Sequence, residues 1–457
     1  MNTPWSERPW RQALVYGLGL SGLAAARLLR SNEVSVLGVD RRSIEEIDLG
    51  DLASDDGVRL LLGSDPQVLP GAFDGVVVSP GVSQDRPLIR DAKRLGVPVI
   101  SEVELAFPYL NGSVIGITGS NGKSTTTAMA GAALRAAGRE VEVCGNIGVP
   151  LSSRVAGAAG RTFVVEVSSF QLESIDTFRP HAAALLNLSE DHLDRHRDLD
   201  SYRSAKERIF ARQEDGDVAV LNADDPLIAE LALRARTRFF SRSGPVEDGC
   251  FLTGDRVLEA VPGSAPRELF RVEDLRVPGV HNLENAMAAA LLARALGAER
   301  EAVRSGVGEF TGLPHRVEHV ARLGDVEWVD DSKGTNVAAT VKSLQGFSEG
   351  SVHLILGGRH KGGDWGELVD LVREKARRVY LIGEAEGELS EVLAGFPAIE
   401  SCGDLETAVE RAAGLAVEGE VVLLSPACAS FDQYDSYARR GEHFQTLVRS
   451  LEEASDG

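Results

Sequence analysis

The sequence contains little cysteine and fewer basic than acidic side chains. Only four of its 457 residues are cysteine, and no two have C-x-x-C spacing, so neither a zinc ribbon nor a disulfide framework is supported. Lys and Arg number 48 against 69 Asp and Glu, which gives a net charge of −21. Because such a surface repels phosphate groups, we expect no nucleic-acid partner and no attraction to anionic membranes.

Long apolar runs are also absent. No stretch of 18 consecutive apolar residues occurs, and the opening segment MNTPWSERPWRQ has no apolar signal core. We therefore expect a cytoplasmic protein without a membrane-inserted segment. At about 150 residues per domain, the length suggests three domains.

Short apolar runs alternate with segments of helical period along most of the chain, which predicts an α/β fold with mainly parallel sheets covered by helices. The pattern restarts at residues 114–118 and again after Gly312, so we predict domains over residues 1–101, 102–312 and 313–457. Residues 236–278 have Gly and Pro between short apolar pieces, and we expect β-hairpins there. The expected strands are 14–16, 34–39, 76–79, 97–100, 114–118, 140–144, 163–168, 183–186, 217–221, 326–330, 352–356, 379–382 and 421–425. The expected helices are 22–30, 87–95, 124–137, 202–212 and 281–296.

The strongest motif is a glycine-rich loop between a predicted strand and a predicted helix, Gly119-Ser-Asn-Gly122-Lys123-Ser124. Glycines let successive backbone N–H groups point at a phosphate, the helix N-terminus adds positive charge, and the lysine reaches the outer phosphates. The spacing departs from the general P-loop, because Ile117 stands five positions before Gly122. A plain glycine turn with a surface lysine is the alternative, but we expect ATP at this loop.

A second glycine motif, Gly17-Leu-Gly19-Leu-Ser-Gly22, also lies between a strand and a helix, and Asp40 ends the next strand. Taken alone, this is a dinucleotide fingerprint with Asp40 on a ribose. From the residues alone, a nicotinamide-dependent enzyme and a simple tight turn both remain open.

A third group of polar residues lies near the ends of predicted strands, with Glu166 after one strand and His192 after the next. The carboxyl ends of parallel strands line the crevice that holds the phosphate loop, so this carboxylate and imidazole can bind metal ions held by ATP oxygens. A capped surface residue is the alternative for His181, His192 and His196, and a solvated lysine is the alternative for Lys206.

Loops at predicted strand ends also mark the third domain. They are Leu313-Pro-His315-Arg316, Asp330-Asp331-Ser-Lys333-Gly-Thr335-Asn336, Gly357-Gly-Arg-His-Lys361-Gly-Gly-Asp364 and Ser425-Pro-Ala-Cys-Ala-Ser430-Phe-Asp432. Polar and glycine-rich loops that converge on one sheet edge indicate a binding site.

Together, these motifs resemble the Mur ligases, the enzymes that build the peptide stem of peptidoglycan. The resemblance covers essentially the whole chain in order. It implies a Rossmann-like N-terminal domain that holds a uridine diphosphate rather than NAD, a central P-loop ATPase-like α/β domain with a small β subregion, and a C-terminal Rossmann-like domain. It also implies an ATP-dependent ligase that forms an amide bond through an acyl phosphate, and usually a monomer.

Three features are most similar to the members that add D-glutamate to UDP-N-acetylmuramoyl-L-alanine. They are the Gly17 motif, the Ser-Pro-Gly81 loop and the C-terminal Ser-Phe-Asp-Gln-Tyr segment with the following Arg-Gly-Glu-His-Phe. A sister ligase for another amino acid, or a nucleotide-binding protein without catalysis, remains the alternative. The resemblance further implies closure about the Gly312 region.

The resemblance also assigns residues by position. Catalytic roles fall on Lys123, Glu166, His192 and Lys206. The nucleotide is expected at Gly119, Asn121, Gly122, Lys123, Ser124, Thr125, Asn282, Asn285, His315, Arg316, Asp331 and Lys333. Two Mg²⁺ ions are expected on Ser124, Glu166, His192 and Lys206, with Lys206 carbamylated. The uridine diphosphate is expected at Leu20, Ser21, Asp40, Arg41, Arg42 and Gly81, and the muramoyl-alanine end at Asn146, Ser168 and Gln171. D-Glutamate is expected at Thr335, Lys361, Ser430, Phe431 and Tyr437, the last replacing a Phe.

Overall fold

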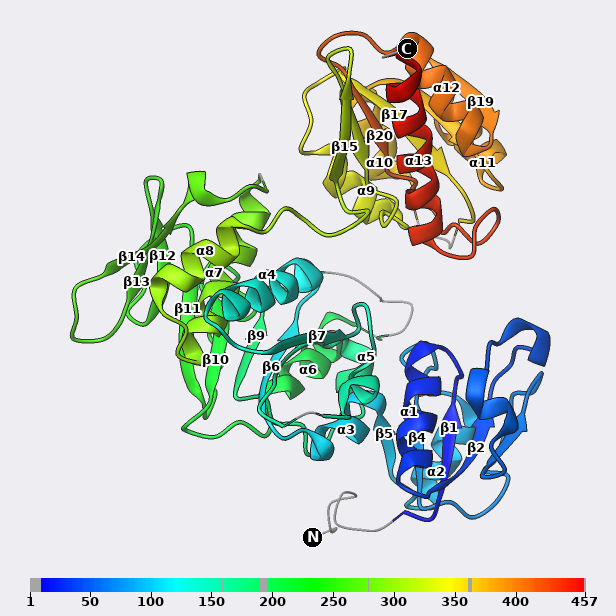
Figure 1. Cartoon of the computed structure of the whole chain (residues 1–457), viewed down its shortest axis with the longest axis vertical. Coiled ribbons are helices and arrows are strands. Elements are labelled where there is room, and N and C mark those ends of the chain that lie inside the picture. Colours follow the sequence, from blue (N-terminus) through cyan, green and yellow to red (C-terminus); the bar gives the residue numbers. More distant parts are fainter. Residues whose placement is uncertain are drawn as a thin grey trace. The chain divides into compact units, whose positions relative to one another are not determined.

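The computed structural model describes residues 10–157, 159–189, 196, 198–277, 279–360 and 364–455. The chain forms two compact units, Met1–Thr311 and Gly312–Gly457. Two sheets lie in the first unit and one in the second, so the predicted α/β class with three sheet domains is confirmed (Figure 1). The domain boundaries after residues 101 and 312 stay predictions. No helix in the described ranges is long and apolar enough to cross a membrane.

The N-terminal sheet is parallel, with strand order β3-β2-β1-β4-β5. Its strands are β1 (Gln12–Tyr16), β2 (Ser35–Val39), β3 (Val58–Leu61), β4 (Gly75–Val78) and β5 (Val99–Ser101), and its helices are α1 (Leu20–Ser31), η2 (Ile44–Glu46), η3 (Gly50–Ser54) and α2 (Pro87–Arg94). Along β1, Ala13 and Val15 pack in the cluster with α1, whereas Leu14 and Tyr16 pack with α2. The two helices therefore cover opposite faces, as the Rossmann-like prediction requires.

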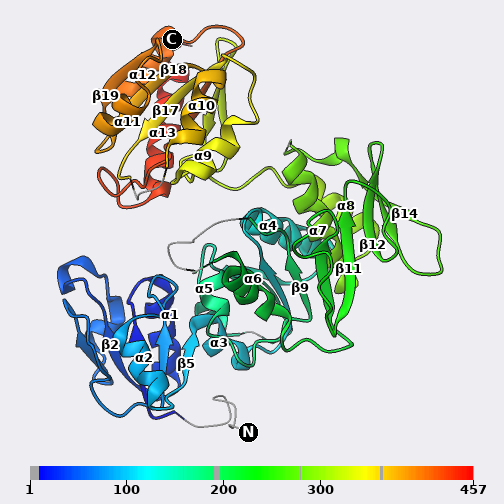
Figure 2. The same ribbon diagram turned by 180° about the vertical axis from the view of Figure 1, so that it is seen from behind.

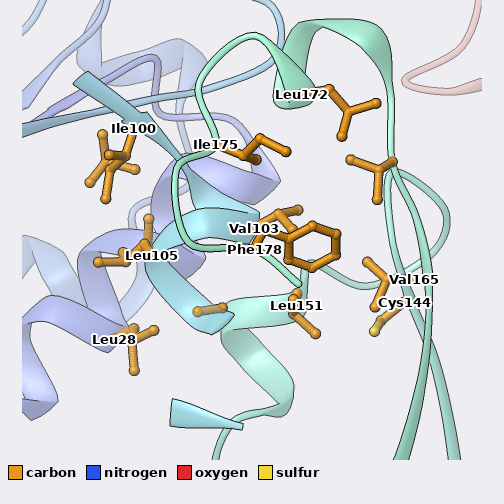
Figure 3. Close-up of a cluster of buried hydrophobic side chains, with 14 of the residues drawn as sticks. Leu28, Ile100, Val103, Leu105, Cys144, Leu151, Val165, Leu172, Ile175 and Phe178 are labelled. Atoms are coloured by element: carbon orange, nitrogen blue, oxygen red, sulfur yellow. The ribbon is translucent and has the colours of Figure 1, made fainter. Parts of the chain in front are cut away.

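The core of the N-terminal sheet continues into the central domain. Helix α3 (Glu102–Ala106) follows β5 directly, and its Val103 and Leu105 lie in one cluster with Leu28 of α1 and Leu151 of η5 (Leu151–Arg154). Figure 3 shows Val103 next to Phe178 of the central domain, with Leu28, Leu105 and Leu151 in the same cluster. This shared core explains why the first two sheets form one compact unit.

A buried carboxyl group lies at this junction. Glu102 is 1% exposed, accepts a hydrogen bond from the Ser152 amide through Oε1, and has no partner for Oε2 among the described residues. Burial raises the pKa of Glu102 to about 7, against the opposing effect of the Ser152 hydrogen bonds. Because the folded protein then binds a proton that the unfolded chain releases near pH 4.5, stability falls as the pH rises from about 4.5 to about 7.

Glu102→Gln is expected to remove this loss of stability. The melting temperature of the variant is expected to match wild type within about 2 °C at pH 4.5 and to exceed it by about 2–6 °C at pH 8. The control is Glu104→Gln on the same helix, because Glu104 accepts hydrogen bonds from Thr177 N and Oγ1 at 2.7 Å each and from Phe178 N at 3.0 Å. The control is expected to melt lower at pH 8, and an E102Q protein that does the same contradicts the prediction.

The central sheet has strand order β14-β13-β12-β11-β10-β9-β6-β8-β7. Its strands are β6 (Ser113–Thr118), β7 (Val141–Gly145), β8 (Thr162–Glu166), β9 (Ala182–Leu185), β10 (Val218–Asn222), β11 (Arg236–Ser241), β12 (Gly249–Thr253), β13 (Arg256–Ala260) and β14 (Arg267–Arg271). Its helices are η4 (Phe107–Tyr109), α4 (Lys123–Ala136), η5, α5 (Ser169–Leu172), α6 (Leu199–Glu207), η6 (Arg208–Phe210), η7 (Val272–Asp274), α7 (Val280–Ala295) and α8 (Arg300–Gly308). The alanine-rich α7 is largely buried and packs in one cluster with α4 and α8.

Two expectations for the central domain need correction. Residues 236–278 were expected to form hairpins, and β12, β13 and β14 do pair antiparallel, but β11 runs parallel to both β10 and β12 and so extends the main sheet. The helix expected at 202–212 begins earlier, at Leu199, because the Asp198 side chain accepts from the Ser201 amide and caps it, and it tightens into η6 after Glu207.

The sheet of the second unit has order β15-β16-β20-β17-β18-β19, and only β15 is antiparallel to its neighbour. Its elements are β15 (Glu318–Leu323), β16 (Val326–Asp330), α9 (Val337–Leu344), β17 (Val352–Gly357), α10 (Gly366–Lys375), β18 (Ala376–Ile382), α11 (Glu386–Val392), β19 (Ile399–Gly403), α12 (Leu405–Leu415), β20 (Val421–Leu424) and α13 (Tyr437–Ser455). Helices α9, α10 and α11 pack on one face, and α12 and α13 on the other (Figure 2).

Candidate active site

The loop between β6 and α4 has the conformation of a phosphate-binding loop. Gly122 caps α4 with φ 81°, and a side chain there would lie 2.2 Å from Asn285 Oδ1. The segment after β9 braces the loop, because the Ser120 amide donates to the Asn187 carbonyl at 3.0 Å and the Asn121 amide donates to Asn187 Oδ1 at 2.9 Å. The loop is therefore rigidly held at the N-terminus of α4, where backbone N–H groups attract an anion.

Two lysines meet at this loop. Lys123 Nζ donates to the Gly119 and Ser120 carbonyls at 2.9 and 2.8 Å, and Lys206 Nζ donates to the Gly119 carbonyl at 2.8 Å. Lys206 is 1% exposed and lies 4.4 Å from the centre of the Tyr202 ring. The alternative of a solvated surface lysine therefore fails, and the amines of two lysines lie together beside the phosphate loop.

Glu166 ends the strand next to the phosphate loop. It lies opposite Ile117 in the β6–β8 register and is 2% exposed. Asn146 Nδ2 donates to Glu166 Oε1 at 3.0 Å, whereas Oε2 is buried with no hydrogen-bond partner among the described residues. Glu166 therefore offers a buried carboxylate oxygen that can accept a further ligand, on the strand next to the one that leads into the phosphate loop. Such an oxygen suits a divalent cation. His192, predicted to share this ion, lies outside the described residues.

The other predicted nucleotide residues of the central domain surround the same loop. Ser124 and Thr125 are buried in the first turn of α4. Asn285 Oδ1 accepts from Thr126 Oγ1 at 3.2 Å, and Asn285 Nδ2 approaches Asn282 Oδ1 at 3.5 Å. The N-terminal turns of α4 and α7 therefore lie together.

Ser168 and Gln171, predicted to hold the muramoyl-alanine end, also cap a helix. The Ser168 amide and hydroxyl donate to Gln171 Oε1 at 3.0 and 3.1 Å, and the Gln171 amide donates to Ser168 Oγ at 3.3 Å. Gln171 Nε2 remains buried without a partner among the described residues. The capping box therefore uses Oε1 of the Gln171 side chain as an acceptor, and Nε2 remains available as a donor.

His181 is exposed, as the surface alternative expected, whereas His196 is buried, so the surface alternative is wrong for it. His181 Nδ1 accepts from the Val114 amide at 3.1 Å. His196 is 4% exposed, lies 3.0 Å from Ser169 Oγ through Nε2, and stacks on Phe170.

A cavity of about 430 Å³ opens at the C-terminal edge of the N-terminal sheet. Gly17 has φ 88°, and a side chain at Gly22 would lie 1.8 Å from the Gly17 carbonyl oxygen, so both glycines are required for the turn that forms one wall. All six residues predicted for the uridine diphosphate line the cavity, together with Tyr16, Ser79 and Arg86. The six are Leu20, Ser21, Asp40, Arg41, Arg42 and Gly81.

Asp40 forms an ion pair within this cavity. Arg42 donates to Asp40 from its amide and its guanidinium at 2.9–3.1 Å, and the Leu18 amide donates at 2.6 Å. Burial opposes ionisation of Asp40, but these hydrogen bonds outweigh it and lower the pKa to about 2. Asp40 is therefore a carboxylate at any physiological pH.

In the second unit, His315 lies in a network of acidic groups. His315 Nδ1 is 2.7 Å from Asp330 Oδ2, and the His315 amide donates to Glu318 Oε2 at 2.7 Å. The hydrogen bond with Asp330 raises the pKa of His315. These three residues have the spacing of a metal site, but Gln445 Nε2 donates to both carboxylates at 3.0 Å and so occupies the position between them.

The neighbouring residues predicted to approach ATP lie beside this network. Asp331 is 3% exposed and accepts from Ser343 Oγ at 2.6 Å and Ser425 Oγ at 2.7 Å. Burial raises the pKa of Asp331 to about 6, while these hydroxyls and the charge of Arg316 oppose the shift. Lys333 Nζ lies 5.5 Å from the centre of the Tyr437 ring, which places a predicted nucleotide residue next to a predicted amino-acid residue.

The predicted D-glutamate residues lie on the loops after β16 and β20 and at the start of α13. The Thr335 amide donates to the Lys333 carbonyl at 2.8 Å. Ser430 is 2% exposed, with its hydroxyl unpartnered among the described residues, whereas Phe431 is 62% exposed. An isolated bridge between Arg359 and Ala429 joins the loop after β17 to the loop after β20. Lys361 lies outside the described residues.

Sequence analysis missed Arg440, which connects these loops. The guanidinium is 1% exposed and donates to Ser332 Oγ and O at 3.0 and 2.9 Å and to the Cys428 carbonyl at 3.1 Å. Burial lowers the pKa of Arg440 to about 10. The sequence held one signal, because Arg440 falls on the helical face of Phe444 and Val448, where an apolar residue is expected.

Comparison with known proteins agrees with this arrangement. The family model described as Mur ligase MurD-like, N-terminal domain, matches residues 11–101, the Mur ligase middle domain matches 117–293, and the Mur ligase, glutamate ligase domain, matches 315–428. Among solved structures, the UDP-N-acetylmuramate–alanine ligase of Thermotoga maritima covers 97% of this chain and 100% of its own, with TM-score 0.61 and 20% identity. The MurF ligase of Thermotoga maritima in complex with ADP covers 95% and 98%, with TM-score 0.57 and 19% identity. At these identities, the structures support the fold.

Closer relatives are found by sequence. The UDP-N-acetylmuramoylalanine–D-glutamate ligase of Koribacter versatilis is 42% identical over 97% of this chain and 98% of its own length. The enzymes of that name from Desulfosudis oleivorans and Pelotomaculum thermopropionicum are 42% and 41% identical, over 97% and 98% of their own lengths. With three family domains matched in order and relatives this similar from end to end, the chain belongs to the Mur ligase family.

Proposed function

We propose that this chain joins D-glutamate to UDP-N-acetylmuramoyl-L-alanine in an ATP-driven reaction of peptidoglycan precursor synthesis in the cytoplasm. Relatives 41–42% identical over nearly the whole chain carry the name of this ligase. The observation that carries the proposal is the meeting of Lys123 and Lys206 on the Gly119 carbonyl, beside Glu166 at the end of the adjacent strand. The nicotinamide alternative is dropped, because the first domain matches the N-terminal domain of a ligase family.

The reaction activates a poor electrophile. The alanyl carboxylate oxygen attacks the γ-phosphorus of ATP, the bond to the β–γ bridging oxygen breaks, and ADP leaves. The amine of D-glutamate then attacks the acyl carbon, phosphate leaves with the C–O electron pair, and the nitrogen loses a proton. Both steps develop negative charge on phosphoryl oxygens, so positioned cations and backbone donors supply most of the catalysis.

The central domain supplies these groups. The amides of the loop from Gly119 to Ser124 and the ammonium of Lys123 hold the triphosphate. Ser124 and Glu166 fit Mg²⁺, because Glu166 Oε2 is buried without a partner among the described residues, and we assign His192 to the same ion. When bound, Mg²⁺ neutralises charge on the transferred phosphoryl group. Gln171 and Asn146 orient the muramoyl-alanine carboxylate next to this group.

We further propose that Lys206 is carbamylated and helps to hold a second Mg²⁺. Its amine is 1% exposed and 2.8 Å from the Gly119 carbonyl, and burial disfavours a charged ammonium. Addition of CO₂ forms a C–N bond, releases a proton and replaces a cation by an anion.

Incubation with ¹³C-bicarbonate is expected to give a carbamate carbonyl signal in the ¹³C NMR spectrum of the wild-type protein. The signal is expected to vanish in Lys206→Ala and to persist in the matched variant Lys93→Ala, whose lysine lies on the surface of α2 and donates to Gln84 Oε1 at 3.0 Å. Identical spectra for wild type and K206A would contradict carbamylation.

The amino-acid site belongs to the second unit. Thr335, Ser430, Phe431, Tyr437 and Lys361 hold D-glutamate, with the buried Ser430 hydroxyl as a donor to one carboxylate. His315, Arg316, Asp331 and Lys333 approach the nucleotide from the same unit.

The test is phosphate release from ATP and Mg²⁺ with UDP-N-acetylmuramoyl-L-alanine and one amino acid at a time. Release that requires D-glutamate is expected, with L-glutamate, L-lysine and meso-diaminopimelate inactive. Release with another amino acid would keep the ligase reaction and overturn the assignment of the amino-acid site. No release with any amino acid would overturn the proposed function.

A further inference from the structure

We infer that a hydrogen bond between Gln84 and Ser174 fixes the spacing between the two ends of the substrate site, so that both are positioning residues that favour a substrate of matching length. The inference rests on the proposed function, which places uridine diphosphate in the cavity of the N-terminal domain and the muramoyl-alanine end at Gln171 of the central domain. Neither Gln84 nor Ser174 is among the residues that line the cavity.

The loop after β4 is fixed to the N-terminal domain by its own hydrogen bonds. Ser79 Oγ donates to the Gly17 carbonyl at 2.6 Å, and the Ser79 amide donates to the Tyr16 carbonyl at 3.0 Å. Gly81, two residues later, lines the cavity. These bonds hold the wall of the cavity in place, and none of them involves Gln84, which lies further along the same loop.

Gln84 reaches from this loop to the central domain. Its Nε2 donates to Ser174 Oγ at 2.9 Å and its Oε1 accepts from Lys93 Nζ at 3.0 Å, so each end of the amide has its own partner. Ser174 is 6% exposed, and its carbonyl accepts from the Ser101 amide at 2.9 Å. The N-terminal domain therefore contacts Ser174 at two points, through the side chain of Gln84 and through the backbone at the end of β5.

Ser174 belongs to the segment that carries the other end of the substrate site. Its amide donates to the Gln171 carbonyl at 3.2 Å. The Nε2 atom of Gln171 is a buried donor without a partner among the described residues, and it is the group that we assign to the muramoyl-alanine end. A short polar path, from Gln84 through Ser174 to Gln171, therefore joins the loop of the cavity to the second end of the site.

This polar path adds a constraint that apolar packing does not supply. Ile175, next to Ser174, packs in the cluster that the two domains share, together with Leu28 and Val103 (Figure 3). Apolar contact is non-directional, whereas a hydrogen bond requires a narrow range of distance and angle. The cluster therefore holds the two domains together, and the bond between Gln84 and Ser174 fixes their spacing.

A substrate that is held at both ends is sensitive to this spacing. UDP occupies only the cavity, whereas UDP-N-acetylmuramoyl-L-alanine must also reach Gln171, and the gain from the second end is lost where the spacing does not match its length. Without the bond, the free protein samples several spacings, and the affinity for the full substrate falls with the fraction that matches. The affinity for UDP alone does not depend on the spacing.

Isothermal titration of the full chain with UDP and with UDP-N-acetylmuramoyl-L-alanine tests this inference. Gln84→Ala and Ser174→Ala remove the same bond from either side. Each is expected to weaken binding of the full substrate about three- to tenfold and to leave the affinity for UDP within about twofold of wild type. Because only one bond is lost, the double variant is expected to match the weaker single variant within about twofold.

The retained affinity for UDP shows that each variant is folded. Wild-type affinity of Q84A for the full substrate would overturn the inference. An equal loss of affinity for UDP would also overturn it, because Gln84 would then act on the cavity itself. A double variant whose loss equals the product of the two single losses would show that the two residues act separately, against the inference.

The matched control is Asn32→Ala, which removes a side-chain amide that donates to the Leu28 carbonyl at 2.8 Å, at the other end of α1 from the cavity. Its affinities for both ligands are expected to equal those of wild type. The wild-type protein is expected to bind the full substrate more tightly than UDP, and equal affinities would overturn the inference, because the second end would add nothing. Failure of the wild-type protein to bind either ligand would instead overturn the proposed function.

Discussion

Replacing Lys123 with methionine is expected to lower kcat for phosphate release roughly 10³-fold, with little change in stability. The Lys123 ammonium is held over the phosphate loop by the Gly119 and Ser120 carbonyls, at 2.9 and 2.8 Å. A bound triphosphate offers the ammonium oxygens with full negative charge, which compete well against neutral carbonyls. Methionine preserves the length and packing of the side chain but lacks the positive charge of the ammonium. That charge stabilises the phosphoryl group during its transfer.

The prediction is checked by steady-state phosphate release with all three substrates, together with melting curves. The matched control is Lys93→Met, which removes one positive charge from the surface of α2 and is expected to leave kcat unchanged. Because removal of a charge that acts in the transition state lowers kcat, a rise in KM alone would show that Lys123 serves only ground-state binding. Wild-type kcat in K123M would contradict the proposed role.

The fold was predictable wherever a strand is buried on both faces. The runs that became β1, β4, β6, β8 and β17 contain continuous apolar residues, and each was found within a few positions. The three strands that were missed, β3, β15 and β19, all lie at an edge of their sheets. Edge strands are half exposed and carry polar residues, as in Ile399–Gly403, so they give neither an apolar run nor a clear alternation.

The candidate site was predictable where a functional residue lies at the end of a predicted strand or directly after it. Glu166 and the loop around Gly122 were placed on neighbouring strands because parallel strands end at one edge. Residues whose role depends on a distant partner were not predictable. The guanidinium of Arg440 meets the carbonyl of Ser332 across 108 positions of sequence, and the Leu18 amide reaches Asp40 only once β1 and β2 lie side by side. Lys206 is the instructive case, since periodicity alone favoured a solvated lysine and the fold buries it.

The second large effect is expected from Glu259, which lies at the centre of a buried ionic cluster in the small β subregion. Its side chain is 1% exposed and binds three guanidinium groups, those of Arg238 at 3.0 Å, Arg294 at 3.1 Å and Arg300 at 2.7 Å. Burial opposes ionisation of Glu259, but its hydrogen bonds with Arg294 and Arg238 outweigh it and lower the pKa. The cluster joins β11 and β13 to α7 and the start of α8.

Glu259→Gln is expected to cost about 3–5 kcal/mol of stability, because the amide keeps the shape of the carboxylate but leaves the buried guanidinium of Arg238 and the partly buried ones of Arg294 and Arg300 without its charge. That loss corresponds to a fall of about 10 °C in the melting temperature. The matched control is Glu268→Gln on the adjacent strand, where the pair with Arg271 at 3.3 Å is partly exposed and contributes about 0–1 kcal/mol. A variant E259Q that melts no lower than E268Q would show that water screens the three guanidinium groups.

The stability that Glu259 contributes also depends on pH. The pKa of Glu259 is lowered in the folded protein, so its contribution is present above the pKa of the unfolded chain and is lost as the pH falls. The difference in melting temperature between E259Q and wild type is therefore expected to shrink in acid.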